Sequence, residues 1–217
     1  MAKKKKNLDD ENLTNEEREE LKKEEQTKYA KKDIFLDVAP YLIIIFFVII
    51  IRTFICSPVT VNGTSMYPTL HDGDYMLLYK LTKKFRGIRR FDIVVVNTKS
   101  GRLVKRVIGL PGENIRYEVK KNESGEPTEG ILYVNGKKVD EDFFGDDAKS
   151  NPLQTCVNNP DICSESGVNV PENEYYVMGD NRGNSTDSRI IGTVSYDSIL
   201  GTTNVILYPF SRIGKAK

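Results

Sequence analysis

One apolar stretch near the amino terminus constrains the fold of this chain more than any other feature. Residues 34–55 are dominated by isoleucine and phenylalanine, and the part from Val38 to Ile51 carries no charge. A helix of this length reaches about 33 Å, enough to cross the hydrocarbon core of a bilayer. Such a helix has apolar residues on every face, so a buried helix of a soluble domain is disfavoured. We therefore predict a single transmembrane anchor over residues 34–56, with Pro40 in its first turns.

The charges that flank this stretch predict its orientation. Five lysines lie between residues 22 and 32, whereas Arg52 is the only basic residue between Ile51 and Lys80. Because positive charge stays on the cytoplasmic side of membrane helices, we predict a single-pass protein of the plasma (cell) membrane with its amino terminus in the cytoplasm. Everything after Ser57 is then extracytoplasmic. A cleaved leader is disfavoured, because no small-x-small site follows the apolar run.

The segment before the anchor, residues 1–33, contains ten basic and ten acidic side chains. It buries too little apolar surface to offset its ordering entropy, so we expect a solvated, charged cytoplasmic tail. A fluctuating helix from Glu16 to Lys32 is the alternative, because Thr14 and Glu17 have the spacing of a capping box. The net charge of the whole chain is +1, which disfavours nucleic acid as a partner.

Strand-like patterns dominate the remaining residues, 57–217. The runs are Phe91–Asn97, Leu103–Ile108, Ile131–Val134, Lys137–Val139, Glu174–Met178 and Thr203–Leu207. Asn135-Gly136 is typical of a hairpin turn, and helical periodicity is confined to short pieces around Tyr196–Leu200. We predict a mainly β protein: an antiparallel β-sheet domain that follows one N-terminal transmembrane helix. Residues 117–170, rich in turn formers, are expected to form a variable subdomain away from the chemistry-bearing segments.

Two cysteines, Cys156 and Cys163, flank a loop that lies outside the membrane in this topology. An oxidising compartment and the short separation make a structural disulfide plausible, and two free thiols are the alternative. No histidine or further cysteine lies nearby in the sequence, so a metal site is disfavoured.

Ser65 is a candidate nucleophile in the segment VNGTSMYPT. Gly63 lies two residues before it, and a glycine there lets the backbone approach a substrate carbonyl closely. An ordinary turn serine is the alternative for this motif taken alone. The chain has one histidine, His71, so a Ser-His-Asp triad is hard to assemble.

Lys105 is a candidate general base in the run RLVKRVI. Leu103, Lys105 and Val107 share one face of the expected strand. Apolar neighbours disfavour the ammonium form and lower the pKa of a lysine, which suits it to accept a proton near neutral pH. The alternative is an edge-strand lysine that extends to solvent.

A third segment, GDNRGNSTDSR from Gly179 to Arg189, predicts a compact, hydrogen-bonded loop. Asp187 and Arg189 are expected to pair or to hold neighbouring backbone. Asp180 is expected to hold either Arg106 or Arg182. Basic residues and the absence of a terminal glutamate argue against a calcium loop.

The anchor and these three segments, in this order, resemble the type I signal peptidases of Gram-positive bacteria. The resemblance implies that Ser65 is the nucleophile, Lys105 the general base and Ser185 a hydroxyl that orients Lys105. It also implies that Asp187 and Arg189 shape the site and that Met66 lies near the substrate pockets. Gly63 stands where some members carry a serine that donates to the oxyanion, so main-chain donors or the nearby Thr64 would replace that hydroxyl.

The function implied is that of a membrane-bound serine endopeptidase. It would remove N-terminal signal peptides from exported pre-proteins, cutting after small-x-small sites and using neither a metal nor an organic cofactor. Met66 and Tyr67 are expected to be exposed and to face the bilayer. A self-cleaving Ser/Lys repressor and an anchored binding domain without catalysis are the alternatives, and His71 is the alternative base.

Overall fold

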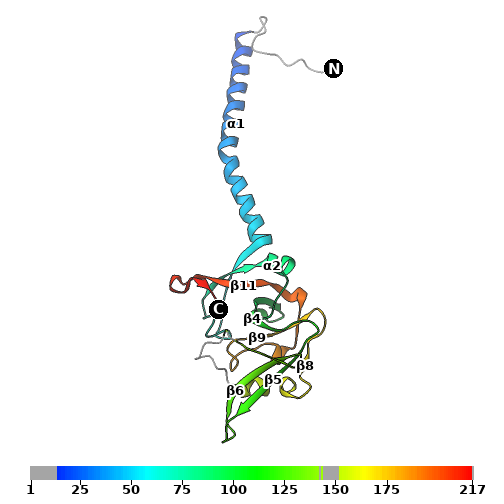
Figure 1. The fold of residues 1–217 in the computed structure, drawn as a ribbon. Helices are drawn as coiled ribbons and strands as arrows, with labels where there is room; N and C mark the ends of the chain where they lie inside the picture. Colours follow the sequence, from blue (N-terminus) through cyan, green and yellow to red (C-terminus); the bar gives the residue numbers. More distant parts are fainter. Residues whose placement is uncertain (1–13, 142, 144–151, 217) are drawn as a thin grey trace. The chain divides into compact units, whose positions relative to one another are not determined.

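A single long helix, α1 (Asn15–Ile50), precedes the β-rich part of the chain (Figure 1). The structure is a computed structural model that describes residues 14–141, 143 and 152–216, and the chain divides into two units between Ile51 and Arg52. A π-helical turn, η1 (Ile51–Ile55), follows α1. The segment Phe35–Ile55 has a mean hydropathy of 2.5 and is long and apolar enough to cross a membrane.

From Asn15 onward the charged segment before the apolar stretch is helical, as in the alternative drawn from the capping-box spacing, and most of its described side chains are exposed. α1 begins at Asn15, and the Arg18 N–H donates to the Thr14 carbonyl oxygen at 3.1 Å. Oppositely charged residues four positions apart, such as Glu24 and Lys28, are neighbours on the surface of a helix and stabilise it. Pro40 consequently lies inside α1 and not in its first turns.

The rest of the chain forms two antiparallel sheets, which confirms the predicted fold class. The larger sheet has the order β1-β2-β11-β3-β4-β9-β10, and β12 pairs with β11. Its strands are β1 (Cys56–Thr60), β2 (Tyr75–Tyr79), β3 (Ile93–Thr98), β4 (Gly101–Gly109), β9 (Glu174–Met178), β10 (Val194–Ser195), β11 (Ile199–Tyr208) and β12 (Gly214–Lys215). The smaller sheet has the order β7-β6-β5-β8, from β5 (Asn114–Lys121), β6 (Pro127–Val134), β7 (Lys137–Val139) and β8 (Val168–Asn169).

The expected runs correspond to strands, but β1, β2 and β5 and the short strands β8, β10 and β12 lie outside them. β5 alternates Ile115, Tyr117 and Val119 with polar residues, so its period-two pattern was present in the sequence. The expected subdomain boundary at residue 117 falls inside this strand. The helical piece expected around Tyr196–Leu200 is a 3₁₀ turn of three residues, Tyr196–Ser198, after which β11 begins.

The predicted hairpin at Asn135-Gly136 is confirmed. Val134 of β6 pairs with Lys137 of β7, and the two turn residues have φ angles of 50° and 75°. Positive φ at both central positions is the type I′ geometry, whose twist matches that of the strands.

The core consists of three clusters that share strands. β3 is buried on both faces, since Ile93 and Val95 belong to one cluster and Val94 and Val96 to another. This central position explains its continuous apolar run. The third cluster joins the two sheets, with Ile108 of β4 packed among residues that include those of β5 and β6. β4 and β9 each contribute side chains to more than one of these clusters, so packing on both faces holds the two strands in place.

Three short helices complete the fold: α2 (Lys80–Phe85), α3 (Pro152–Asn158) and α4 (Ser188–Ile191). Cys156 of α3 and Cys163 form a disulfide with a Cα–Cα distance of 5.5 Å. The bridge closes the loop between α3 and the 3₁₀ turn Pro160–Cys163. The plausible pairing of these two cysteines is thus present.

Candidate active site

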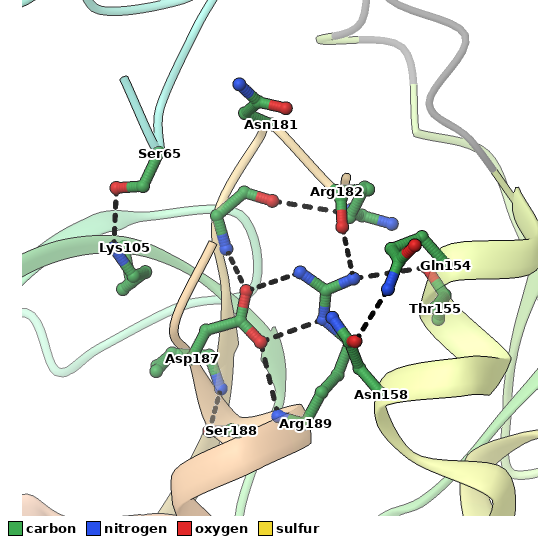
Figure 2. A network of polar contacts seen from close by, with 12 residues as sticks. Ser65, Lys105, Gln154, Thr155, Asn158, Asn181, Arg182, Asp187, Ser188 and Arg189 are labelled. Atoms are coloured by element: carbon green, nitrogen blue, oxygen red, sulfur yellow. Dashed lines mark hydrogen bonds and ion pairs between the residues drawn. The ribbon is translucent and has the colours of Figure 1, made fainter. Parts of the chain in front are cut away.

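Ser65 and Lys105 lie in contact, although forty residues separate them in sequence. Ser65 is in the connection between β1 and β2, and Lys105 is near the middle of β4. Lys105 Nζ donates to Ser65 Oγ at 2.7 Å (Figure 2). It also donates to the Val104 carbonyl oxygen at 3.0 Å. The structure therefore brings together the two residues that the sequence singled out.

The surroundings of Lys105 are apolar, and its side chain is buried. Only 2% of the residue is exposed, its register partner on β3 is the buried Val94, and Val107 follows it on the same face. Burial lowers the pKa of Lys105 to about 8, against the opposing effect of the Asp187 and Asp180 carboxylates. A substantial neutral fraction is then available near neutral pH, which a general base requires.

A groove of about 490 Å³ opens at this pair. Its lining includes residues 58–62 on one wall and 102–105 on the other, together with Ser65. In the part of the chain that the structure describes, β1 pairs only with β2, and β4 pairs with β9 only from Arg106 onward. Both walls therefore present strand edges whose backbone groups are open to an extended peptide.

The loop 179–189 holds the nucleophile by its backbone. The Asn181 N–H donates to the Ser65 carbonyl oxygen at 3.0 Å, and Asn181 Nδ2 donates to the Thr64 carbonyl oxygen at 3.1 Å. Asn184 Nδ2 donates to Thr64 Oγ1 at 3.2 Å. Sequence reasoning missed both asparagines, because nothing local shows that this loop would meet residues more than a hundred positions earlier.

Gly179 lies directly behind the nucleophile. A Cβ atom at this position would lie 2.2 Å from Ser185 Oγ and 2.4 Å from the Ser65 carbonyl oxygen, both far inside contact distance. The Gly179 N–H donates to Asp187 Oδ2 at 2.8 Å. Close approach of the two segments is thus possible only without a side chain.

Asp187 and Arg189 form a fully buried pair. Arg189 Nε donates to Asp187 Oδ1 at 2.8 Å and Arg189 Nη2 donates to Oδ2 at 2.7 Å, with both side chains 0% exposed (Figure 2). Burial alone raises the pKa of Asp187, but the bonds from Arg189 and from Gly179 outweigh it and the pKa is lowered. The predicted pairing of these residues is present, and the carboxylate stays ionised.

Asp180 pairs with Arg106 and not with Arg182, which resolves the alternative left open by the sequence. Arg106 Nε and Nη2 donate to the two Asp180 oxygens at 2.8 and 2.6 Å. Arg182 is itself buried and forms an ion pair with Glu141. Arg106 is on β4 beside Lys105, so this pair fixes the loop to the strand that carries the candidate base.

Ser185 does not form the hydrogen bond expected of it. Its hydroxyl is buried, and among the described residues Ser185 Oγ has no hydrogen-bond partner of normal geometry. It lies near enough to the Asp187 carboxylate to favour its ionised form. The bonds of Lys105 Nζ go to Ser65 and Val104 instead.

The expected exposure of Met66 is wrong. Met66 is 1% exposed, packs in the core with Val61 and Leu70, and is absent from the described lining of the groove. The reason is local, because the chain turns after Ser65 and directs this side chain inward. Tyr67 is 53% exposed, as expected, and its ring stacks on that of His71 with a centroid distance of 5.2 Å.

Gly63 has a φ of 84°, a conformation that favours glycine, and its N–H donates to Asp72 Oδ1 at 2.6 Å. That N–H therefore has a carboxylate partner already.

Within the described residues no group of three histidine, cysteine or acidic side chains is arranged to hold a metal ion.

The segment 117–170, which was expected to lie away from the chemistry, contacts the loop 179–189. Besides the ion pair from Glu141, Arg189 Nη1 donates to Thr155 Oγ1 of α3 at 3.4 Å. Asn159 Nδ2 donates to the Tyr176 hydroxyl at 3.1 Å. Residues 117–170, called the insert below, thus support the loop 179–189 through these contacts. The expectation that they lie away from it is corrected.

Residues 35–208 match the family model described as signal peptidase, peptidase S26. The chain belongs to this family. As a family member it is a serine endopeptidase of the signal peptidase I type, which removes signal peptides from exported pre-proteins. Its apolar helix and its relatives make it a membrane-anchored enzyme. A binding domain without catalysis and a self-cleaving repressor are excluded.

Signal peptidases of Bacillus are similar over most of the chain. Signal peptidase I of Bacillus amyloliquefaciens is 37% identical over 90% of this chain and 100% of that protein. Signal peptidase I S of Bacillus subtilis (strain 168) is 38% identical over 86% of this chain and 96% of that protein. A crystal structure of a signal peptidase I from Enterococcus faecalis V583 is 28% identical, covers 53% of this chain and 95% of that chain, and has a TM-score of 0.36.

Proposed function

We propose that Ser65 and Lys105 form the catalytic dyad with which this enzyme cleaves signal peptides. The observation that carries the proposal is the 2.7 Å separation of Lys105 Nζ and Ser65 Oγ, together with the burial that lowers the pKa of Lys105 to about 8. His71 is less suited to be the base, because its ring is exposed and stacks on Tyr67.

The reaction runs as a covalent acyl transfer. Neutral Lys105 accepts the Ser65 proton as Oγ attacks the scissile carbonyl carbon, and a tetrahedral intermediate forms. The lysine ammonium then gives this proton to the departing amine, and an acyl-enzyme remains. Lys105, neutral again, removes a proton from water, whose oxygen attacks the ester carbonyl carbon. As Ser65 Oγ leaves, the lysine ammonium returns this proton to it, which regenerates the free enzyme.

The developing oxyanion needs donors in the same place. We propose the Ser65 N–H as the first, because Asn181 anchors the neighbouring carbonyl groups and so fixes the orientation of this segment. One such donor contributes roughly 3 to 4 kcal/mol to transition-state stabilisation. Gly63 N–H is engaged by Asp72, so Thr64 is the remaining candidate for a second donor.

The pre-protein enters the groove as an added strand and pairs with the open edges of β1 and β4. Small side chains at the first and third positions before the cut fit beside Ser65 and Leu103. In the proposed topology residues 1–33 lie in the cytoplasm, 34–56 cross the bilayer and 57–217 lie outside. The cleavage site of an exported chain emerges on that outer side.

The loop residues act as positioning residues in this proposal. Asp187 is held ionised by Arg189 and biases the charge of Lys105. Asp180 fixes the loop to β4 through Arg106. Ser185 fills the space beside Gly179 and comes within reach of Lys105 only if its hydroxyl shifts.

The test is cleavage of a synthetic pre-protein by the detergent-solubilised full chain. We expect wild type to cut after a small-x-small site, Ser65→Ala and Lys105→Ala to be inactive while folded, and His71→Ala to keep most activity. Folding is checked by circular dichroism and urea unfolding. If Lys105→Ala is folded and cuts, or if His71→Ala is as inactive as Lys105→Ala, the lysine is not the base.

A further inference from the structure

The groove carries an unbalanced positive charge. Of the residues that line it in the described part of the chain, Arg102 and Lys105 are charged and none is acidic. Lys105 must be neutral when it acts as a base, whereas an arginine guanidinium remains charged under all working conditions. Arg102 is then the one fixed charge that the lining presents to a bound peptide.

Arg102 lies at a defined distance from the reacting bond. It precedes Lys105 by three residues on β4, about 10 Å of extended strand, and because side chains alternate it lies on the opposite face of the strand from Lys105. Across the pairing with β3 its register partner is Asn97, which is uncharged. The facing wall, residues 58–62, is also uncharged. Nothing that lines the groove therefore neutralises the guanidinium.

A peptide that lies along the open edge of β4 advances at the same rise per residue as the strand itself. The peptide residue that faces Arg102 is accordingly three or four positions from the bond that faces Ser65. A side chain at that position meets an exposed cation at the open edge of β4, where water screens part of the attraction. The charge of the peptide side chain at this position should therefore change kcat/KM, because it affects the binding of the substrate and of the transition state alike.

We propose that Arg102 is a specificity-determining residue that favours pre-proteins with an acidic side chain three or four residues from the cleaved bond. The inference rests on the proposed function, because it requires the peptide to lie in this groove. Arg102 also disfavours a basic side chain at the same place, which is a means of rejecting substrates as well as selecting them.

The experiment is a charge scan of the substrate in neutral detergent at low salt. One synthetic pre-protein peptide is made with Asp, Asn or Lys at each position from two to six residues on either side of the cut. kcat/KM is measured for the full-length wild type. We expect Asp to exceed Asn by about two- to fivefold at the third or fourth position on one side, as for a partly exposed ion pair. At the other positions the ratio should stay near one.

Three variants isolate the cause. Arg102→Gln should bring the Asp-to-Asn ratio to one, and Arg102→Glu should invert it in favour of Lys. Lys99→Gln is the matched control, because Lys99 is an exposed cation three residues away that does not line the groove, and it should keep the wild-type ratio. Each ratio is internal to one variant, so a reduced folded fraction cancels. Raising the salt concentration should shrink the wild-type ratio.

The outcomes separate this inference from the proposed function. If no peptide is cut by wild type or if Ser65→Ala cuts them all, the proposed function fails. If wild type cuts every peptide with a flat charge profile, or if Arg102→Gln keeps the wild-type ratio, only the role of Arg102 is overturned. A third outcome is a flat charge profile together with an Arg102→Gln variant that loses activity only on anionic vesicles. That outcome would assign Arg102 to lipid headgroups and would also overturn its role in substrate choice.

Discussion

The proposed catalytic pair, Ser65 and Lys105, and the loop 179–189 behind it are held in opposite ways. Ser65 and Lys105 meet through one contact of 2.7 Å, and Lys105 Nζ has a single backbone carbonyl as its other hydrogen-bond partner. Behind them Asp187 and Arg189 form a bidentate ion pair that is fully buried. The reacting groups are thus free to exchange a proton, while the groups that support them are fixed.

This difference shows how the chain keeps a lysine able to lose its proton beside two carboxylates. A carboxylate in direct contact with Lys105 would stabilise the ammonium form and raise its pKa. Asp187 bonds to Arg189 and Asp180 bonds to Arg106, so each acid has an arginine partner. The arginines occupy the carboxylates and leave burial as the largest influence on the lysine.

The largest expected effect comes from removing the base while keeping its shape. Lys105→Met should lower kcat roughly 10² to 10⁴-fold, because a general base contributes about that much. Stability should stay equal or rise, since a desolvated amine is replaced by an apolar group of similar length. Cleavage rates and urea unfolding measure the two properties. If Lys105→Met were strongly destabilised, the lysine would have a structural role like that of the buried ion pair. The difference between the two regions would then not hold.

The supporting pair should behave in the reverse manner. Asp187→Asn leaves Arg189 buried without its counter-ion, so we expect a loss of roughly 3 to 5 kcal/mol in unfolding free energy, with activity falling in parallel. Glu118→Gln, in the exposed pair with Arg116, is the control and should change stability by less than about 1 kcal/mol. Equal costs for the two variants would contradict a structural role for the buried pair.

The contact between the two regions can be disturbed directly at Gly179. Gly179→Ala introduces a Cβ at 2.2 Å from Ser185 Oγ and 2.4 Å from the Ser65 carbonyl oxygen, so the nucleophile must move. A shift of about 1 Å can lower activity roughly 10²-fold. Gly183→Ala is the matched control in the same loop, where the added atom would meet only Asn181 Oδ1 at 3.9 Å. Similar activities for both variants would mean that the close approach is not needed.

The dependence of activity on pH reports the charge balance. In the proposed mechanism neutral Lys105 is the active form, so kcat/KM should rise about tenfold per pH unit and level off near the lysine pKa of about 8. Asp187 raises the pKa of Lys105 and Arg189 lowers it, so the limb should move to lower pH in Asp187→Asn and to higher pH in Arg189→Met. Shifts in the opposite directions would show that the arginine does not shield the lysine.

The same shift affects stability with a defined sign. The pKa of Lys105 falls from 10.5 to about 8 on folding, so between these values the unfolded chain binds more protons than the folded chain. The stability of wild type relative to Lys105→Met should therefore rise from pH 8 toward pH 10.5.

The smallest effect should come from the insert that buttresses the loop. Replacing Cys156 and Cys163 by serine removes a bridge that closes a short loop, a loss of about 2 to 3 kcal/mol. Activity of the folded protein should change less than about threefold, because Thr155 meets Arg189 across a long hydrogen bond of 3.4 Å. Cys56→Ser, at the free cysteine, is the control. A kcat loss near that of Gly179→Ala would make the insert part of the reacting machinery.

Local patterns in the sequence were sufficient to predict the fold class and to single out Ser65 and Lys105, which the structure brings into contact. Ser65 follows a turn, Lys105 lies within an apolar period-two run, and Asn135-Gly136 marks a hairpin, so each is recognisable without knowing its partner. β5 was equally recognisable by its alternation and was overlooked. The antiparallel architecture follows from many such short strands joined by turns.

What the sequence did not predict depends on contacts between distant segments. The choice of Asp180 between two arginines is decided by the pairing of β4 with β9, which brings Arg106 to the loop. Met66 was expected to be exposed. The turn after Ser65 that directs its side chain into the core has no recognisable pattern in the local sequence. The clamp from Asn181 to Thr64 spans more than a hundred residues and leaves no periodic pattern.

The open edges of β1 and β4 make the groove a filter of conformation before it is a filter of sequence. Only a chain whose own amide and carbonyl groups are unengaged can complete these edges, and residues in a helix or in the interior of a sheet have none to offer. If the pre-protein binds these edges as proposed, a folded domain should resist cleavage even where it contains a small-x-small run. The enzyme would then cut only segments that are still unfolded, even when folded exported proteins are present around it.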